Sequence, residues 1–311
     1  FDYAEKESLA LLDLKDLEAV LNWMLEHRKE LQKQYGSLSP QSLGAIVRRV
    51  LVLKTDGGEV FFGEPALDIH DLIRQQDGQG VINLLDGRQL MMQPRVYTTF
   101  LLWLLAELFE QLPERGDQPL PLLVFFFDEA HLLFDNAPDA LLEKLEQTVR
   151  LIRSKGVGIY FVTQSPADIP DSVLGQLGNR IQHALRAYTP KDQKAVKTAA
   201  QTFRPNPALD TVQVITELGV GEALVSMLDD QGVPSMVERT LIAPPRSQIG
   251  PVDEAAQAAL KASSPLAGKY DQVMDRDSAH EKLQARREQQ EKALVEKPEP
   301  EKKASMKRSR G

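Results

Sequence analysis

Hydrophobic residues follow two spacings along the chain, and stretches with the two spacings alternate. Steps of three and four residues are typical of helices with one apolar face, and short uninterrupted apolar runs are typical of strands covered on both faces. The helical spacing covers residues 3–35, 40–50, 97–112, 139–154 and 190–202, and the strand-like runs cover 81–85, 122–127, 156–164 and 179–187. This alternation predicts an α/β fold with a mostly parallel, doubly wound sheet flanked by helices.

Changes in the pattern divide the chain into three parts. Residues 1–75 are mostly helical, with a short extended piece at 60–62, and we expect a cap or insertion there. Residues 76–250 hold the alternating strands and helices and end in a predicted hairpin. Residues 251–311 are rich in charge, which predicts a helix that continues into a flexible tail.

Composition narrows the class of protein only a little. The 311 residues carry a formal net charge of −8, which argues against a generally basic surface for nucleic acid but allows a local one. The chain has no cysteine, hence no disulfide, and no stretch has the roughly 18 apolar residues of a membrane span. We therefore expect a cytoplasmic protein. Because the chain starts with Phe1, we also expect it to be part of a longer protein.

Two acidic residues follow the most apolar strand. Leu122 to Phe127 are six apolar residues in a row, and Asp128 and Glu129 come directly after them. Ligands of parallel α/β sheets bind at the carboxyl ends of strands, and this pattern is that of a Walker B strand. Glu129 would orient or deprotonate the water that attacks ATP, and Asp128 would hold a magnesium-bound water. The alternative is an ordinary acidic turn before a helix, where the helix dipole favours carboxylates.

A single polar residue follows the next apolar strand. Gln164 comes about 35 residues after Glu129, at the end of the run 156–164. We predict that Gln164 lies beside the γ-phosphate and reports its state. The alternative is a glutamine that caps a loop, since Ser165 and Pro166 follow it.

Arginines could supply positive charge for phosphoryl transfer. Arg180 and Arg186 lie in the run 179–187, and a guanidinium directed at the nucleotide of a neighbouring subunit raises the rate by about 10³ to 10⁵. Each of the two could equally form an ordinary salt bridge. Arg150 and Arg153, on the preceding helix, are weaker candidates because they fit surface positions.

One part of an ATPase site is missing from the sequence. No Gly-x-x-x-x-Gly-Lys-Ser/Thr loop occurs, so we expect this stretch alone to bind nucleotide poorly and the loop to be encoded upstream of Phe1. Other chemistries have less support. The five histidines show no metal-ligand spacing, and no Gly-x-Ser-x-Gly element of serine hydrolases is present.

Four motifs, in this order, resemble those of bacterial ATPases with a HerA-like C-terminal domain, in the HerA/FtsK group of motors. They are Phe-Phe-Phe-Asp-Glu-Ala-His at 125–131, Tyr-Phe-Val-Thr-Gln-Ser-Pro at 160–166, Leu-Gly-Gln-Leu-Gly-Asn-Arg-Ile-Gln-His-Ala-Leu-Arg-Ala at 174–187 and Gly-Val-Gly-Glu-Ala-Leu-Val at 219–225. The resemblance implies a RecA-like fold, ATP hydrolysis with magnesium, and a homo-oligomeric ring, a hexamer, acting on DNA.

The resemblance also implies roles for single residues. It makes Asp128 the Walker B aspartate, Glu129 the catalytic glutamate and Gln164 the polar sensor. Arg180 or Arg186 would be the arginine finger, which acts on the nucleotide of a neighbouring subunit. The chain departs from the DNA-translocating members at 164–166, where they usually carry Gln-Arg-Pro and this chain carries Gln-Ser-Pro.

The sequence thus supports the hypothesis of the C-terminal portion of a P-loop ATPase that drives a ring motor, with DNA as a candidate substrate. The alternative is a catalytically inactive scaffold or nucleic-acid-binding subunit of the same fold. A two-domain helicase is a weaker alternative, because the chain lacks the Ser-Ala-Thr element and the paired arginines of that class.

Overall fold

The computed structural model describes all residues except 117, 135–136, 138, 275 and 296–311. Its contacts group the chain into two compact units: unit 1 consists of residues 1–66 and 266–311, and unit 2 of residues 67–265. Unit 1 therefore joins segments from opposite ends of the chain. Across the described residues, none of the helices combines the length and apolar character needed to cross a membrane. The three-part division expected from the sequence stays a prediction.

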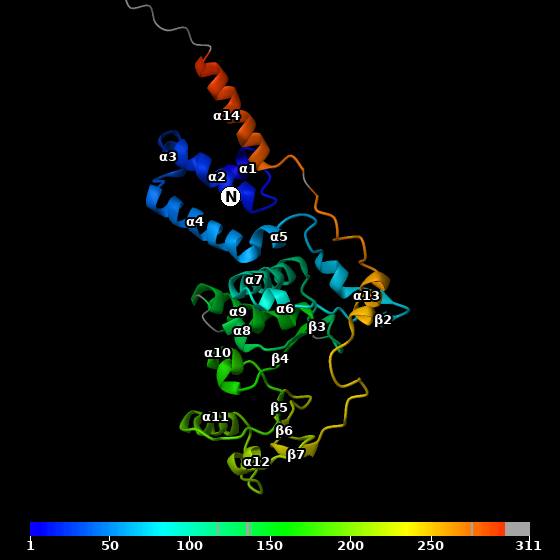
Figure 1. Ribbon diagram of the computed structural model, residues 1–311. Coiled ribbons are helices and arrows are strands. Elements are labelled where there is room, and N and C mark those ends of the chain that lie inside the picture. The colour runs from blue at the N-terminus through cyan, green and yellow to red at the C-terminus, as the bar shows by residue number, and fades with distance from the viewer. Residues whose placement is uncertain (117, 135–136, 138, 275, 296–311) are drawn as a thin grey trace, which may run out of the picture. The chain divides into compact units, whose positions relative to one another are not determined.

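Unit 1 is helical in its described part (Figure 1). Its elements are α1 (Asp2–Lys6), α2 (Leu14–Glu26), α3 (Arg28–Tyr35), α4 (Pro40–Leu53), the π-helix η1 (Lys54–Gly58), α5 (Glu59–Phe61) and α14 (Ala279–Val295). As predicted, α4 begins with Ser39 as its N-cap and Pro40 at its first position. Side chains of α1, α2 and α14, including Tyr3, Trp23 and Leu283, form one buried hydrophobic cluster.

Two predictions in this region are wrong. The helix expected over 3–35 is interrupted, because the Asp13 carboxylate accepts the N–H groups of Lys15 and Asp16 and so starts α2 anew. The extended piece expected at 60–62 is helical up to Phe61. The reason is local, since Gly57 inside η1, with φ of 93°, kinks the chain and α5 follows η1 without a break.

Unit 2 holds the described strands and the remaining described helices. Its helices are η2 (Ile69–Ile73), α6 (Arg88–Met91), α7 (Pro94–Gln111), α8 (His131–Phe134), α9 (Asp139–Leu151), η3 (Ile152–Lys155), η4 (Pro166–Asp168), α10 (Asp171–Leu174), α11 (Pro190–Gln201), α12 (Thr211–Glu217) and α13 (Glu254–Ser263). Its strands are β1 (Gln75–Gln76), β2 (Gln79–Gly80), β3 (Leu123–Phe127), β4 (Val157–Phe161), β5 (Arg180–Gln182), β6 (Glu222–Ser226) and β7 (Glu238–Leu241). Helices thus alternate with strands from β3 to β6, as the pattern predicts.

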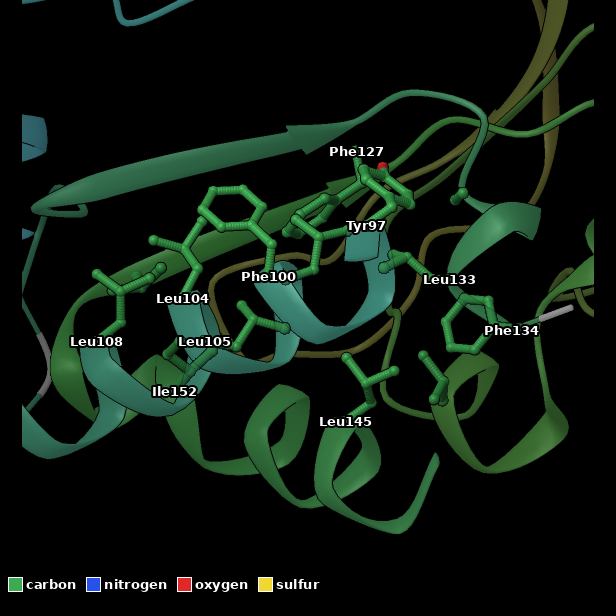
Figure 2. Packing of buried hydrophobic residues seen from close by; sticks show 14 of the residues in the cluster. Tyr97, Phe100, Leu104, Leu105, Leu108, Phe127, Leu133, Phe134, Leu145 and Ile152 are labelled. Atoms are coloured by element: carbon green, nitrogen blue, oxygen red, sulfur yellow. The ribbon is translucent and has the colours of Figure 1, made fainter. Parts of the chain in front are cut away.

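Helix α7 is the centre of the larger hydrophobic core of unit 2. Figure 2 shows Leu104, Leu105 and Leu108 of α7 packed between the strands and the helices that follow them. Leu105 and Leu108 are at most 1% exposed. This confirms the apolar face predicted over 97–112. A second cluster packs α11 and α12 against β6.

The sheets are smaller than the doubly wound sheet expected. β3 pairs in parallel with β4, in the register Leu123 to Val157 through Phe127 to Phe161, so the parallel part is confirmed. β5 instead belongs to an antiparallel sheet with the order β5-β6-β7, which contains the predicted hairpin. The strand expected at 81–85 is wrong, because none of these residues is in a strand of the described structure and Ile82 is 86% exposed.

The sheet of β3 and β4 has one buried and one exposed face among the described residues. Phe127 packs into the core at 6% exposure, whereas Phe126 is 68% and Tyr160 51% exposed. These two rings stack on each other at 4.7 Å between centroids. The expectation that the strand at 122–127 is covered on both faces is therefore wrong for this part of the chain. Phe127 belongs to the core cluster that has α7 at its centre.

Candidate active site

The parallel pairing of β3 and β4 brings the predicted site residues to one end of the sheet. Phe127 and Phe161 are opposite each other at the carboxyl ends of their strands. The pairing continues past the strands, since Val162 N–H donates to the Phe127 carbonyl at 2.8 Å and Ala130 N–H donates to the Val162 carbonyl at 2.9 Å. The residues that follow each strand therefore lie side by side.

Glu129 and Gln164 meet at this end. The Gln164 Nε2 lies 3.4 Å from Oε1 and 3.3 Å from Oε2 of Glu129, although 35 positions separate them in the sequence. The His131 Nδ1 also lies 3.3 Å from Glu129 Oε2. Glu129 has a φ of 48°, in the left-handed region that few residues with a side chain adopt. Its carboxylate is thus held between an amide and an imidazole.

Asp128 lies at the exposed edge of the same turn. Its Oδ1 accepts the N–H of Glu129 at 3.0 Å, which ties the two acids together. Burial, and then the nearby charge of Asp128, raise the pKa of the Tyr97 hydroxyl on α7. Figure 2 shows Tyr97 beside Phe127, the last residue of β3. Asp128 is therefore exposed to solvent and near enough to Tyr97 for its charge to act on that hydroxyl.

The loop that carries Gln164 is fixed on both sides by Asp168. The Asp168 Oδ2 accepts the Thr163 hydroxyl at 2.8 Å and the Ser165 N–H at 3.1 Å. Ser165 in turn caps η4 by accepting the N–H of Ala167 at 3.3 Å. This capping box holds the backbone at Gln164, so the amide reaches Glu129 from a constrained loop.

The acids fit magnesium chemistry only together with a nucleotide. Among the described residues, no group of three or more histidine and acidic side chains could hold a metal ion. Magnesium is usually bound by one or two carboxylates, waters and substrate phosphates, and Asp128 offers one exposed carboxylate of this kind. Asp128 would hold the ion through water, and the ion would neutralise phosphate charge.

The two predicted finger residues, Arg180 and Arg186, make their contacts elsewhere than at Glu129 and Gln164. Arg180 donates to three backbone carbonyls, with Nε 3.2 Å from Leu177, Nη2 3.1 Å from Leu174 and Nη1 on Thr202. Arg186 donates to two carbonyls, those of Thr216 and Leu218, the latter at 2.9 Å. Both guanidinium groups thus bind at the ends of helices α10, α11 and α12, where cations are favoured.

Three contributors to the site were not singled out from the sequence: Tyr97, Thr163 and Asp168. Asp168 could have been found, because Ser165-Pro166-Ala167-Asp168 follows the pattern of a capping box. Tyr97 carries no local signal, since only the tertiary packing of α7 on β3 brings it near Asp128.

Comparison with known proteins identifies the family. The family model described as "Helicase HerA-like C-terminal" matches residues 1–310. The chain belongs to this family. In a sequence comparison with curated proteins, the chain matches none.

Solved structures show only distant similarity. The genome packaging NTPase B204 from Sulfolobus turreted icosahedral virus 2 in complex with AMPPCP has 14% identity and a TM-score of 0.32, over 71% of this chain and 94% of that chain. The same NTPase in complex with ATP-gammaS has 14% identity and a TM-score of 0.32, over 70% of this chain and 93% of that chain. Structural overlap this small establishes neither a shared fold nor a shared function.

Proposed function

We propose that Asp128, Glu129 and Gln164 form the acidic half of an ATP-hydrolysing site in a P-loop motor. The observation that carries the proposal is the contact of Gln164 with Glu129 at the carboxyl end of two parallel strands. Glu129 orients or deprotonates the attacking water, Asp128 holds a magnesium-bound water, and Gln164 couples the Glu129 carboxylate to the γ-phosphate. Membership of the HerA-like family supports this assignment.

The phosphate-binding loop, in this proposal, comes from a segment outside these 311 residues. The sequence contains no such loop. The exposure of Phe126 and Tyr160 supports a position of the missing segment on the uncovered face of β3 and β4. Parallel sheets are normally covered on both faces. In this proposal a further parallel strand pairs at the edge of the sheet, the loop follows that strand, and the helix after the loop covers both rings. This arrangement would complete a RecA-like core.

The finer features of the motor are also proposals. We propose a homo-oligomeric ring, a hexamer, that acts on DNA, and the word helicase in the family description supports the choice of DNA as substrate. Arg180 and Arg186 stay predicted fingers for a neighbouring subunit. To act in that way, each guanidinium would have to leave the backbone carbonyls that it contacts.

The test is ATP turnover by the gene product that includes the phosphate-binding loop, with and without DNA. We expect Glu129→Gln to lower kcat by about 10² to 10⁴, because an amide cannot take the proton from water. Glu143→Gln, an exposed glutamate on α9, is the matched control and should leave turnover unchanged. Absence of turnover in the parent protein would instead support the inactive scaffold, and unchanged turnover in Glu129→Gln would contradict the catalytic role proposed for Glu129.

A further inference from the structure

Unit 2 contains a pocket away from the Asp128 and Glu129 acids. It has a volume of about 310 Å³ and lies between the chain around Gly178, the end of α11 and strand β6. Its polar lining includes Arg180, Arg204 and Ser226, and its apolar lining includes Phe203. The volume is at the lower end of the range typical of sites for small molecules.

The lining of this pocket carries two positive charges and no carboxylate. Arg180 and Arg204 both line it, and no aspartate or glutamate does. Among the described residues, neither arginine makes an ion pair within 4.0 Å, whereas Arg239 and Arg276 each pair with a glutamate. The two pocket arginines therefore lack the counter-ion that other arginines of the chain have.

Both guanidinium groups also keep unused donors. A guanidinium has five N–H donors. Arg180 directs three of them at carbonyls, and Arg204 directs one at the Pro234 carbonyl at 3.0 Å. Burial lowers the pKa of Arg180, as expected for a cation withdrawn from water without an anion beside it. Both arginines that line the pocket therefore have donors left for an anion.

The carbonyls that Arg180 contacts compensate only part of this charge. The C-terminal end of a helix carries roughly half a negative charge. Arg180 contacts carbonyls at the C-terminal ends of α10 and α11, whereas Arg204 contacts the Pro234 carbonyl. The apolar wall at Phe203 lowers the local polarity, which strengthens attraction between an anion and the two arginines.

We propose that this pocket binds a phosphate-type oxyanion between the guanidinium groups of Arg180 and Arg204. Arginine recognises such groups through paired N–H bonds. The chemistry is shared by small phosphate compounds and by the phosphodiester backbone of a nucleic acid. The pocket shares no residue with the acidic cluster, although it shares Arg180 with the finger role proposed above.

The test uses the 311-residue chain and pyrophosphate, with binding measured by titration calorimetry. Arg204→Gln should weaken binding at least about tenfold, because a charge-assisted contact is lost. Arg204→Lys keeps the charge and should retain most of the affinity. Arg246→Gln removes an exposed arginine of unit 2 outside the pocket and is the matched control.

A second arm identifies the source of the anion. A single-stranded oligonucleotide that displaces pyrophosphate, with an affinity that falls steeply with salt, assigns the pocket to a nucleic-acid backbone. An oligonucleotide that leaves pyrophosphate bound assigns it to a small phosphate compound. The proposal is overturned if pyrophosphate does not bind, or if Arg204→Gln and Arg246→Gln have the same effect. Within the described part of the chain, the Arg204 side chain donates to one carbonyl, that of Pro234, so unfolding of Arg204→Gln is not expected.

Discussion

Glu129, which contacts Gln164, has a left-handed backbone. A φ of 48° at a residue with a side chain costs about 1–2 kcal/mol, and surrounding contacts must offset that cost. Here the Asp128 carboxylate accepts the Glu129 N–H, and Ala130 is bonded to Val162 on the neighbouring strand. The conformation that turns the carboxylate toward Gln164 is therefore imposed by neighbours on both strands.

Asp168 offers a test of how the loop at Gln164 is held. Asp168→Ala removes the acceptor for the Thr163 hydroxyl and the Ser165 N–H, so we expect a loss of about 1–2 kcal/mol in the free energy of unfolding. Urea unfolding measures the loss. Asp171→Ala, an exposed aspartate three residues on, is the matched control. Equal losses in the two variants would show that the capping box does not hold this loop.

The helix α14 shows how one element is started by its own first residues. Ser278 precedes the helix, and its N–H donates to the Glu281 Oε2 at 3.0 Å while its hydroxyl also donates to that oxygen. The Ser278 hydroxyl first, and backbone N–H groups with it, lower the pKa of Glu281 to about 2. The carboxylate thus stabilises the start of α14 as long as it is ionised.

This cap predicts a pH dependence for the stability of unit 1. Glu281 has a folded pKa of about 2 and an ordinary value of 4.5, so its contribution is complete above about pH 4.5 and is lost as the pH falls toward 2. Glu281→Gln should be less stable than the parent chain at pH 7, by at most about 1 kcal/mol because the group is partly exposed. Thermal unfolding at pH 7, 4 and 2.5 measures the difference.

The difference in stability between the parent chain and Glu281→Gln, followed as the pH falls, tests this role. The difference in stability should shrink as Glu281 in the parent chain takes up its proton. Glu288→Gln, on the exposed side of α14, should show no such pH-dependent difference. A difference at pH 2.5 as large as at pH 7 would contradict the role assigned to the Glu281 carboxylate.

At the scale of the whole molecule, the exposed aromatic face of β3 and β4 gives the next prediction. In the 311-residue chain, Phe126→Ser with Tyr160→Ser should cost at most about 1.5 kcal/mol, because little more than the ring stacking is lost. In the protein with its phosphate-binding loop, the same double variant should cost about 3 kcal/mol or more, since both rings are then buried. Urea unfolding of both forms gives the two values.

A substitution elsewhere on the surface controls for this comparison. Val220 is fully exposed in unit 2, and Val220→Ser should have the same small effect in both forms. An equally small cost of the aromatic double variant in both forms would show that the loop segment does not cover this face. ATP turnover by the longer form would then have to come from another arrangement of the loop.

The sequence alone determined the features that depend on near neighbours. The three- and four-residue spacing of leucines placed α7, the Ser39-Pro40 pair placed the start of α4, and the apolar run before Asp128 placed β3. Each of these signals is complete within a few residues. The run at 81–85 carries the same kind of signal but is not a strand in the described structure, because an apolar run gives only a preference that pairing must complete.

Tertiary structure decided what depends on distant contacts. The register of β3 with β4 brings Gln164 to Glu129, and the packing of α7 brings Tyr97 near Asp128. It also placed α14, read from the sequence as part of a charged tail, against α1 and α2. Pairing and burial join residues far apart in the chain, and no local pattern of side chains records which partner each will meet.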